Sequence, residues 1–123
     1  MQNNTNRKTG FEKEDKAATY LTQNGFRIVE RNFYARGGEI DIIGYDGEYL
    51  VFVEVKYRSG NSLGNPLLAV GFEKQRKICR TADYYRYRKG IGPDVPVRYD
   101  VVGMWEEKIE WIKNAFSHMY AKR

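Results

Sequence analysis

The stretch from Gly38 to Tyr57, GEIDIIGYDGEYLVFVEVKY, decides how this chain folds. Two runs rich in Ile, Val, Leu, Phe and Tyr flank the pair Asp46-Gly47, and such a pair between apolar runs is a strong signal for a tight β-hairpin. Three charged residues interrupt these runs, where an ordinary sheet core has apolar side chains: Asp41, Glu54 and Lys56. The stretch therefore predicts a hairpin that carries charge on part of one face.

The register of this hairpin follows if Asp46 and Gly47 are its two turn residues, because Tyr45 then faces Glu48. Side chains alternate between the faces of a strand, so one face holds Glu39, Asp41, Ile43, Leu50, Phe52, Glu54 and Lys56. The other face is apolar and holds Ile40, Ile42, Val51, Val53 and Val55. In this register Asp41 and Glu54 are diagonal neighbours, roughly 5 to 8 Å apart at Cβ. We therefore expect one buried face, and a second face that changes from apolar to charged as at the mouth of a cleft.

Helical and strand patterns flank the hairpin on both sides. Apolar residues at three- and four-residue spacings predict a helix from Gly10 that ends at Asn24-Gly25, with Glu14 near its apolar face. A second such pattern, rich in Lys and Arg, predicts a basic helix from about Pro66 to Arg88. The other expected segments are a frayed tail over 1–9, a strand over 26–31, loops over 32–38 and 58–66, strands over 97–104 and 108–112, and a short helix or turn near 114–118.

The predicted elements come in the order α-β-β-β-α-β-β. The helix between the third and fourth strands allows those strands to lie parallel with a right-handed crossover, whereas the hairpin strands are antiparallel. The expected fold is therefore of the α/β class, a mixed β-sheet flanked by helices. With 123 residues, of which 41% are hydrophobic, the chain has the size of one ordinary domain, which we place at residues 10–123.

Composition limits the classes of partner and compartment. A net charge of +5 favours a polyanionic partner, either nucleic acid or acidic lipid. The single cysteine, Cys79, excludes an internal disulfide and any cysteine-based metal site. No apolar run approaches the ~20 residues of a membrane span, and the N-terminus lacks the hydrophobic segment of a secretory signal. We therefore expect a cytoplasmic protein that does not enter a membrane.

The charged end of the hairpin indicates a cation site. One alternative is a salt bridge at the end of the sheet, in which Lys56 neutralises Glu54. Burying charges costs several kcal/mol per ion even when they are paired, and Asp41 adds a second carboxylate. The excess negative charge favours a bound cation. Mg²⁺, or Mn²⁺ in its place, is typically held by one or two carboxylates with waters and substrate phosphates, and this trio matches that demand.

Phosphodiester hydrolysis is the chemistry that such a site supports. Asp41 and Glu54 are expected to hold one or two divalent ions, which polarise the scissile phosphate and lower the pKa of the attacking water. Lys56 is expected to orient that water and to stabilise the charge that develops on the phosphate. The sole histidine, His118, has no partner motif, and we expect it to be non-catalytic.

These residues also carry a resemblance. Asp41, followed after the hairpin turn by Glu54-Val55-Lys56, resembles the signature of the PD-(D/E)XK nuclease superfamily, which includes restriction endonucleases and archaeal Holliday-junction resolvases. Over residues 10–117 the chain is similar to the bacterial YraN-like family of uncharacterised proteins. The matching segments are GFEKEDKAATYL, Arg31-Asn32, GEIDII, LVFVEVKYR, Gly64-Asn65-Pro66, RYDVV and Asn114-Ala115-Phe116.

The resemblance implies a restriction-endonuclease-like core with Asp41, Glu54 and Lys56 in the catalytic positions. It also implies that Glu14 is an auxiliary acidic residue, although a helix-surface carboxylate paired with a lysine is an equal alternative. Ile40 stands where many superfamily members have proline, a departure that removes no ligand. Resolvase-like members bring a Gln or Lys from the next helix to the site, and by location this is Gln75 or Lys74.

The expected function is a divalent-metal-dependent endonuclease that acts on nucleic acid, with DNA favoured over RNA. The alternatives are a nuclease-fold module that binds nucleic acid or a protein without turnover, and a metal-free cluster of structural salt bridges. A homodimer stays open, since no stripe of residues identifies a dimer face. The residues expected to contact nucleic acid are Arg36, Arg58, Lys74 and Gln75.

Overall fold

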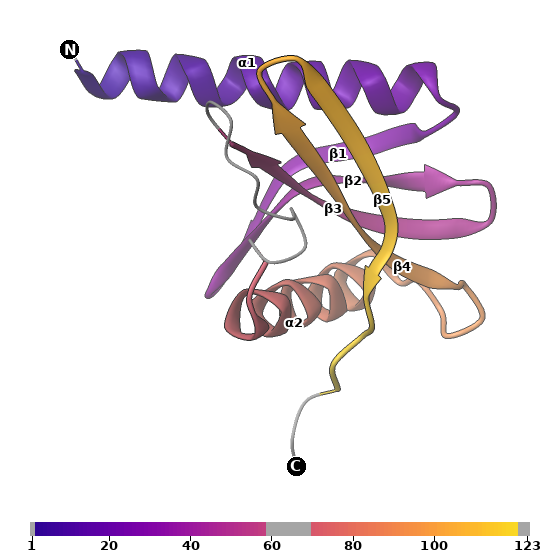
Figure 1. Cartoon of the computed structure of the whole chain (residues 1–123). Helices are drawn as coiled ribbons and strands as arrows, with labels where there is room; N and C mark the ends of the chain where they lie inside the picture. The colour runs from indigo at the N-terminus through magenta and orange to yellow at the C-terminus, as the bar shows by residue number, and fades with distance from the viewer. Residues whose placement is uncertain (1, 59–69, 121–123) are drawn as a thin grey trace.

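The computed structural model describes residues 2–58 and 70–120, with the side chains of residues 12–58 and 70–120. A five-stranded mixed sheet, with its strands in sequence order, lies between two helices (Figure 1). The predicted α/β class and the order α-β-β-β-α-β-β are confirmed. The elements are α1 (Gln2–Gln23), β1 (Arg27–Ala35), β2 (Gly38–Asp46), β3 (Tyr49–Tyr57), α2 (Phe72–Lys89), β4 (Val97–Trp105) and β5 (Lys108–Phe116).

Helix α1 covers one face of the sheet. Its apolar residues Ala17, Ala18 and Leu21 pack against a layer formed by Phe26, Ile42, Val51, Val53, Val102 and Met104. The helix ends where predicted, with Gly25 at a φ of 92° and the Phe26 N–H bonded to the Leu21 carbonyl. It begins at Gln2 rather than Gly10, so residues 2–9, which the sequence predicts as a frayed tail, have a helical backbone. The apolar spacing marks where α1 packs, and the polar turns before it extend the same backbone.

Helix α2 covers the opposite face. Ile78, Cys79, Ala82 and Tyr85 pack on a layer that includes Phe33, Ile40, Ile43, Leu50, Phe52, Tyr99 and Val101. The helix ends at Gly90, which has a left-handed φ of 65° and bonds back to the Arg86 carbonyl. It begins at Phe72 after an extended Gly71, later than the predicted start near Pro66. The predicted loop over 58–66 lies outside the described residues, except for Arg58.

The hairpin between β2 and β3 differs from the predicted register. Its turn residues are Gly47 and Glu48, so Asp46 faces Tyr49 and Ile42 faces Val53. Gly47 takes the first turn position with a φ of 61°, while the Asp46 carboxylate stays in the strand, held by Arg98 at 2.7 Å and Lys113 at 3.1 Å. Partners shift by two residues, and a shift of two does not by itself move a side chain to the other face, so Ile42, Ile43, Leu50, Val51, Phe52 and Val53 lie on their predicted faces.

Strand β1 is longer than predicted and contains an irregular residue. The predicted loop over 32–38 is wrong, because β1 continues to Ala35, pairs with β2 and turns at Arg36-Gly37. Asn32 has a left-handed φ of 52°, which asparagine tolerates better than most residues. Beyond this point the alternation changes, and Ile40 packs on the α2 side, whereas we expected it on the same face as Ile42.

The tip of the β1–β2 hairpin lies against α2. Gly38 is the first residue of β2, and a Cβ at this position would collide with Thr81 Oγ1 and lie 3.5 Å from the Lys77 carbonyl oxygen. Glycine therefore allows the hairpin backbone and the helix backbone to approach closely. The tip and the middle of α2 form one packed unit.

The last two strands complete the sheet. β3 and β4 are parallel, as predicted, with Leu50 opposite Val97 and Tyr57 opposite Met104. β5 continues to Phe116, so the short helix predicted near 114–118 is wrong. Pairing with β4 extends the strand, and Asn114, at a φ of 55°, donates its backbone N–H to Asp100. No helix in the described part of the chain is both long and apolar enough to cross a membrane.

Candidate active site

The two central carboxylates meet where β2 and β3 separate. Ile42 and Val53 are the last residue pair recorded at this end of the ladder. The next residue of β2 after this pair is Asp41, and the next residue of β3 is Glu54. Asp41 Oδ2 accepts a hydrogen bond from the backbone N–H of Val55, the residue after Glu54, at 2.8 Å. The structure therefore brings Asp41 and Glu54 close enough for the charge of Glu54 to raise the pKa of Asp41.

Glu54 is 5% exposed and is paired with two lysines. Lys56 Nζ and Lys74 Nζ each lie 3.5 Å from Glu54 Oε1. Lys56 comes from the same strand, as predicted, whereas Lys74 reaches in from the first turns of α2. The expectation that one lysine faces two carboxylates is therefore wrong. Among the described residues no ion pair joins Asp41 to a cation, so both lysines serve Glu54.

Glu14 joins this group through Asn32. The Asn32 amide Nδ2 donates to Glu14 Oε1 at 2.8 Å and to Glu39 Oε1 at 3.2 Å. Asn32 thus connects α1 to the start of β2 beside Asp41. Sequence reasoning missed Asn32 as a site residue, although the Arg31-Asn32 pair is one of the segments that carry the resemblance; asparagine is also a residue type suited to the left-handed region.

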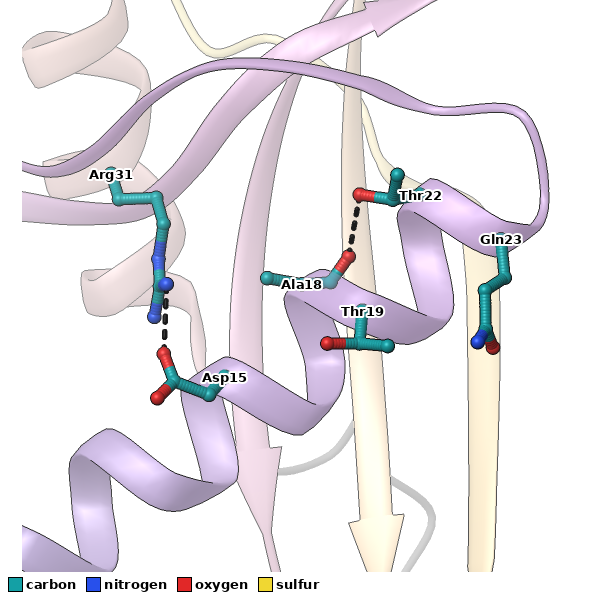
Figure 2. A pocket seen from close by; sticks show the side chains of 6 residues that line it. All are labelled: Asp15, Ala18, Thr19, Thr22, Gln23 and Arg31. Carbon is teal, nitrogen blue, oxygen red and sulfur yellow. Dashed lines mark hydrogen bonds and ion pairs between the residues drawn. The ribbon is translucent and has the colours of Figure 1, made fainter.

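The next residue pair fixes α1 at the same place. Arg31 Nη1 bonds Asp15 Oδ1 at 2.8 Å, one residue along from the Asn32–Glu14 contact on each element. Figure 2 shows this ion pair at one end of a hollow of about 470 Å³ along α1. Its other labelled lining residues are Ala18, Thr19, Thr22 and Gln23 (Figure 2). Asp15 is the one acid among the described residues that line the hollow. We therefore assign the Arg31–Asp15 ion pair a structural role, which is to position α1 and the Glu14 side chain that α1 carries.

Burial and mutual repulsion perturb the central carboxylates. Desolvation raises the pKa of Asp41 to about 8, the charges of Glu54, Glu14 and Glu39 add to the rise, and the Val55 N–H opposes it. Burial also raises the pKa of Glu54, against the opposing effect of Lys74 and Lys56. Four carboxylates and two lysines share the site, so ionised Asp41 lacks a countercharge. Without an added cation, Asp41 holds its proton near neutral pH.

The donor set fits a small hard cation. In the described residues no group of three or more His, Cys, Asp or Glu side chains is arranged to hold a metal ion. Mg²⁺ does not require such a cage, because one or two carboxylates suffice when water and phosphate oxygens complete its shell. Asp41 and Glu54 supply that number. The oxygen chemistry of the pair and the missing countercharge at Asp41 both favour this ligand.

The other predicted contact residues are less central. Gln75 Nε2 donates to the Val70 carbonyl at 2.9 Å and so supports the start of α2 rather than the acids. Arg36 is exposed in the β1–β2 turn. Arg58 donates its backbone N–H to Met104, and no described ion pair joins its side chain to the carboxylates. The His118 ring stacks on Tyr99, and its Nε2 lies 3.4 Å from Asp83 Oδ1. No described contact joins His118 to the site carboxylates Asp41, Glu54 or Glu14.

A second acidic centre, around Asp100, is structural. This carboxylate is fully buried and accepts bonds from Arg98, from Trp111 Nε1 at 2.8 Å and from the Asn114 N–H at 2.9 Å. With these donors satisfied and the Arg98 charge beside it, Asp100 needs no cation. Sequence reasoning missed it, because two of its donors, Trp111 and Asn114, lie on β5 and reach Asp100 only when the β4–β5 hairpin forms.

Comparison with known proteins identifies relatives that are similar over most of the chain. A UPF0102 protein of Lachnoclostridium phytofermentans is 48% identical over 107 residues, covering 87% of this chain and 91% of that protein. UPF0102 proteins of Marinobacter nauticus (43% identity, 94% of this chain and 97% of that one) and Dechloromonas aromatica (46%, 94% and 93%) are similar over nearly their whole length. The names of these relatives state a family and no activity. The family model for UPF0102, described as an uncharacterised protein family, matches residues 13–104 and confirms the resemblance to the YraN-like family. The chain therefore belongs to the uncharacterised protein family UPF0102.

Proposed function

We propose that this protein is a divalent-metal-dependent endonuclease that hydrolyses phosphodiester bonds in nucleic acid. The observation that carries the proposal is the pair of desolvated carboxylates, Asp41 and Glu54, at the point where β2 and β3 separate. Within residues 12–58 and 70–120 the Asp41 carboxylate has no ion pair with a cation, and Lys56 lies beside its neighbour Glu54. Perturbed carboxylates next to a positioned lysine are typical of catalytic rather than structural clusters.

Each residue has a distinct role in this proposal. Asp41 and Glu54 would hold Mg²⁺ or Mn²⁺, which when bound polarises the phosphate and lowers the pKa of a coordinated water. Lys56 orients the attacking water and stabilises the negative charge that grows on the phosphate oxygens. Water adds to phosphorus, the P–O bond to the leaving sugar breaks, and the leaving oxygen takes a proton. Glu14 is held in place by Asn32 and adds negative charge on the α1 side of the site.

Charge supports nucleic acid as the partner in this proposal. The chain carries a net charge of +5, and α2, which supplies Lys74, has Arg86, Arg88 and Lys89 in its last turn. Cationic side chains near a site bind phosphates along the backbone without reading sequence. Lys74 therefore serves two purposes in the proposal, since it pairs with Glu54 and faces an approaching phosphate from the start of α2.

A cleavage assay tests the function. Purified protein is incubated with branched, single-stranded and duplex DNA in Mg²⁺ or Mn²⁺, beside the Asp41→Asn and Lys56→Ala variants. We expect cleavage by the wild type and at least about a 10²-fold loss in each variant. Matched controls are Glu73→Gln and Lys77→Ala, an exposed acid and an exposed lysine of α2, which should cut as the wild type does. Cleavage that persists in both site variants overturns the catalytic assignment.

One observation favours a second function, a nuclease-fold module that binds nucleic acid without cutting it. Two lysines already lie on Glu54 Oε1, so the protein supplies much of the countercharge that a metal would bring to this carboxylate. In that case wild type and Asp41→Asn bind DNA equally and neither cleaves it. Calorimetry distinguishes the two, because only the enzyme requires Mn²⁺ binding that the Glu54→Gln variant weakens.

A further inference from the structure

A hollow of about 450 Å³ lies between the tip of the β1–β2 hairpin and α2. Three arginines and two tyrosines dominate its lining: Tyr34, Arg36, Arg80, Tyr84 and Arg88. We name it the arginine–tyrosine pocket. Positions 80, 84 and 88 recur every four residues along α2 and form one wall, while Tyr34 and Arg36 form the other. Its volume is in the range of pockets that hold a small organic ligand.

In the described part of the chain the arginines of this pocket have no anionic partner. Among the described residues no ion pair joins Arg36, Arg80 or Arg88 to a carboxylate, and all three are exposed. Four other arginines are paired: Arg31 with Asp15, Arg76 with Glu73, Arg86 with Asp83 and Arg98 with Asp46 and Asp100. Arg27 and Arg58 also have no ion pair among the described residues, but neither lines this hollow. Three unpaired guanidinium groups around one hollow favour an anionic ligand, and phosphate matches their forked donor geometry.

The tyrosines add flat aromatic surface to the same pocket. Tyr34 is 68% exposed and Tyr84 is 45% exposed, whereas the adjacent Tyr85 is core. The Tyr84 ring packs against the ring of Phe33, with ring centroids 6.3 Å apart. Exposed rings beside arginines are the combination that holds unpaired bases, since every base has a face that stacks on an aromatic ring. The ligand class with both a phosphate and a flat ring is a nucleotide.

The arginine–tyrosine pocket adjoins the acidic residues. Tyr34 on β1 is the direct ladder partner of Glu39 on β2. Glu39 in turn is bonded to Asn32, which also holds Glu14. The negative charge of Glu39 raises the pKa of the Tyr34 hydroxyl, because the two side chains lie close together. One side chain, Tyr34, therefore belongs to the pocket wall and lies next to the acidic group.

We propose that the arginine–tyrosine pocket binds one unpaired nucleotide next to the scissile phosphate, so that the substrate is single-stranded or branched nucleic acid rather than intact duplex. This inference rests on the proposed function, because it takes the acidic residues as the cutting site. A base inside a duplex is stacked and paired, and it enters a side pocket only after it is flipped out. A single strand or a branch point presents such a base without that cost.

Binding without metal tests the pocket independently of cleavage. Fluorescence anisotropy with a labelled single strand and a blunt duplex of equal length is measured in EDTA, where no cutting occurs. We expect the single strand to bind about tenfold more tightly than the duplex. Tyr34→Leu with Tyr84→Leu should remove most of that difference and leave duplex binding within about twofold of the wild type. Arg80→Gln should weaken both probes and reduce the salt dependence by about one phosphate contact.

Matched variants decide the outcome. Tyr87→Leu removes a tyrosine of α2 that is 85% exposed and outside the pocket, and Arg76→Gln removes an exposed arginine paired with Glu73. Both should bind as the wild type does. Equal binding of single strand and duplex, or pocket variants that behave like these controls, overturns the proposal. A wild type that prefers single strands but cuts nothing in Mg²⁺ or Mn²⁺ instead overturns the proposed function and leaves the pocket assignment standing.

Discussion

The Asp41 carboxylate accepts a hydrogen bond from the Val55 backbone N–H, at 2.8 Å, at the point where β2 and β3 cease to pair with each other. A side chain thereby satisfies the amide that the separation of the strands would leave without a partner. The same bond fixes the direction of the carboxylate, and the Val55 N–H limits the rise in the pKa of Asp41. The geometry of the sheet and the chemistry of the site thus depend on one contact.

The first prediction concerns stability and pH. Since the pKa of Asp41 is raised in the folded protein, the folded state binds this proton more tightly than the unfolded state. Its contribution to stability is complete below the ordinary pKa of 3.8 and is lost as the pH rises to about 8. Asp41→Asn should therefore unfold like the wild type near pH 4 and be more stable by about 1–3 kcal/mol at pH 8. Urea unfolding in EDTA measures this, and an Asn variant no more stable at pH 8 would contradict it.

The second prediction concerns the metal. A cation at Asp41 and Glu54 must displace the proton that Asp41 holds near neutral pH. Affinity for Mn²⁺ should therefore fall by up to about tenfold for each pH unit below 8, with about one proton released per ion. Titration calorimetry in two buffers of different ionisation enthalpy counts the proton. An affinity that is unchanged between pH 6 and pH 8 would rule out Asp41 as a ligand.

The third prediction separates the two lysines on Glu54. Lys56→Gln should lower the cleavage rate by about 10²–10³-fold, because it removes a donor aimed at the developing charge. Lys74→Gln should lower the rate by about tenfold or less, since its side chain is 42% exposed and solvent partly replaces it. Mn²⁺ affinity should be retained in both variants. Equal losses of rate in single-turnover assays would show that neither lysine has a special position.

The fourth prediction concerns Asn32. Alanine at this position removes the bonds to Glu14 and Glu39 and also places a less suitable residue at a φ of 52°. Asn32→Ala should destabilise the protein by about 1–3 kcal/mol, and Asn32→Gly by less, because glycine adopts this φ without strain. Both variants should lose cleavage activity, since Glu14 is no longer held. Chemical denaturation ranks the two, and equal stability would show that the backbone conformation carries no strain.

The fifth prediction concerns the structural acid. Asp100→Ala leaves the Trp111 and Asn114 donors without their acceptor and removes one of the two carboxylates on Arg98. We expect a loss of about 3–5 kcal/mol, the scale for breaking a buried pair. The matched change at exposed Asp94 should alter stability by less than about 0.5 kcal/mol. A small effect at Asp100 in thermal unfolding would show that Asp46 alone satisfies Arg98.

How much of the site follows from sequence depends on the range of each interaction. Asp41, Glu54 and Lys56 were predicted together because side chains alternate along a strand, and a register error of two residues leaves that alternation intact. The Asp46-Gly47 signal located the hairpin correctly and misplaced its turn by one residue, since the Asp46 carboxylate is held by Arg98 and Lys113 from distant strands. The local pattern predicted the face of most hairpin residues, Ile40 excepted, and did not predict which residues form the turn.

The features of the site that the sequence did not predict depend on contacts between different segments of the folded chain. Lys74 reaches Glu54 only because α2 packs across β3, and the basic pattern of that helix does not single out this lysine. The segment from Asn32 to Gly38 was predicted as a loop because it carries the flexible pair Gly37-Gly38, whereas pairing with β2 extends the strand through Ala35. Ile40 lies on the face opposite to the predicted one because the alternation of side chains changes near Asn32, whose backbone is left-handed.

The close approach of Gly38 to Thr81 has a consequence for ligand capture. The hairpin tip and the middle of α2 are the two walls of the arginine–tyrosine pocket, and this contact leaves no room for a side chain between them. The walls are thus fixed relative to each other when the protein folds, before any ligand arrives. A nucleotide that enters therefore meets a preorganised cavity, and little of its binding free energy is spent on ordering the protein.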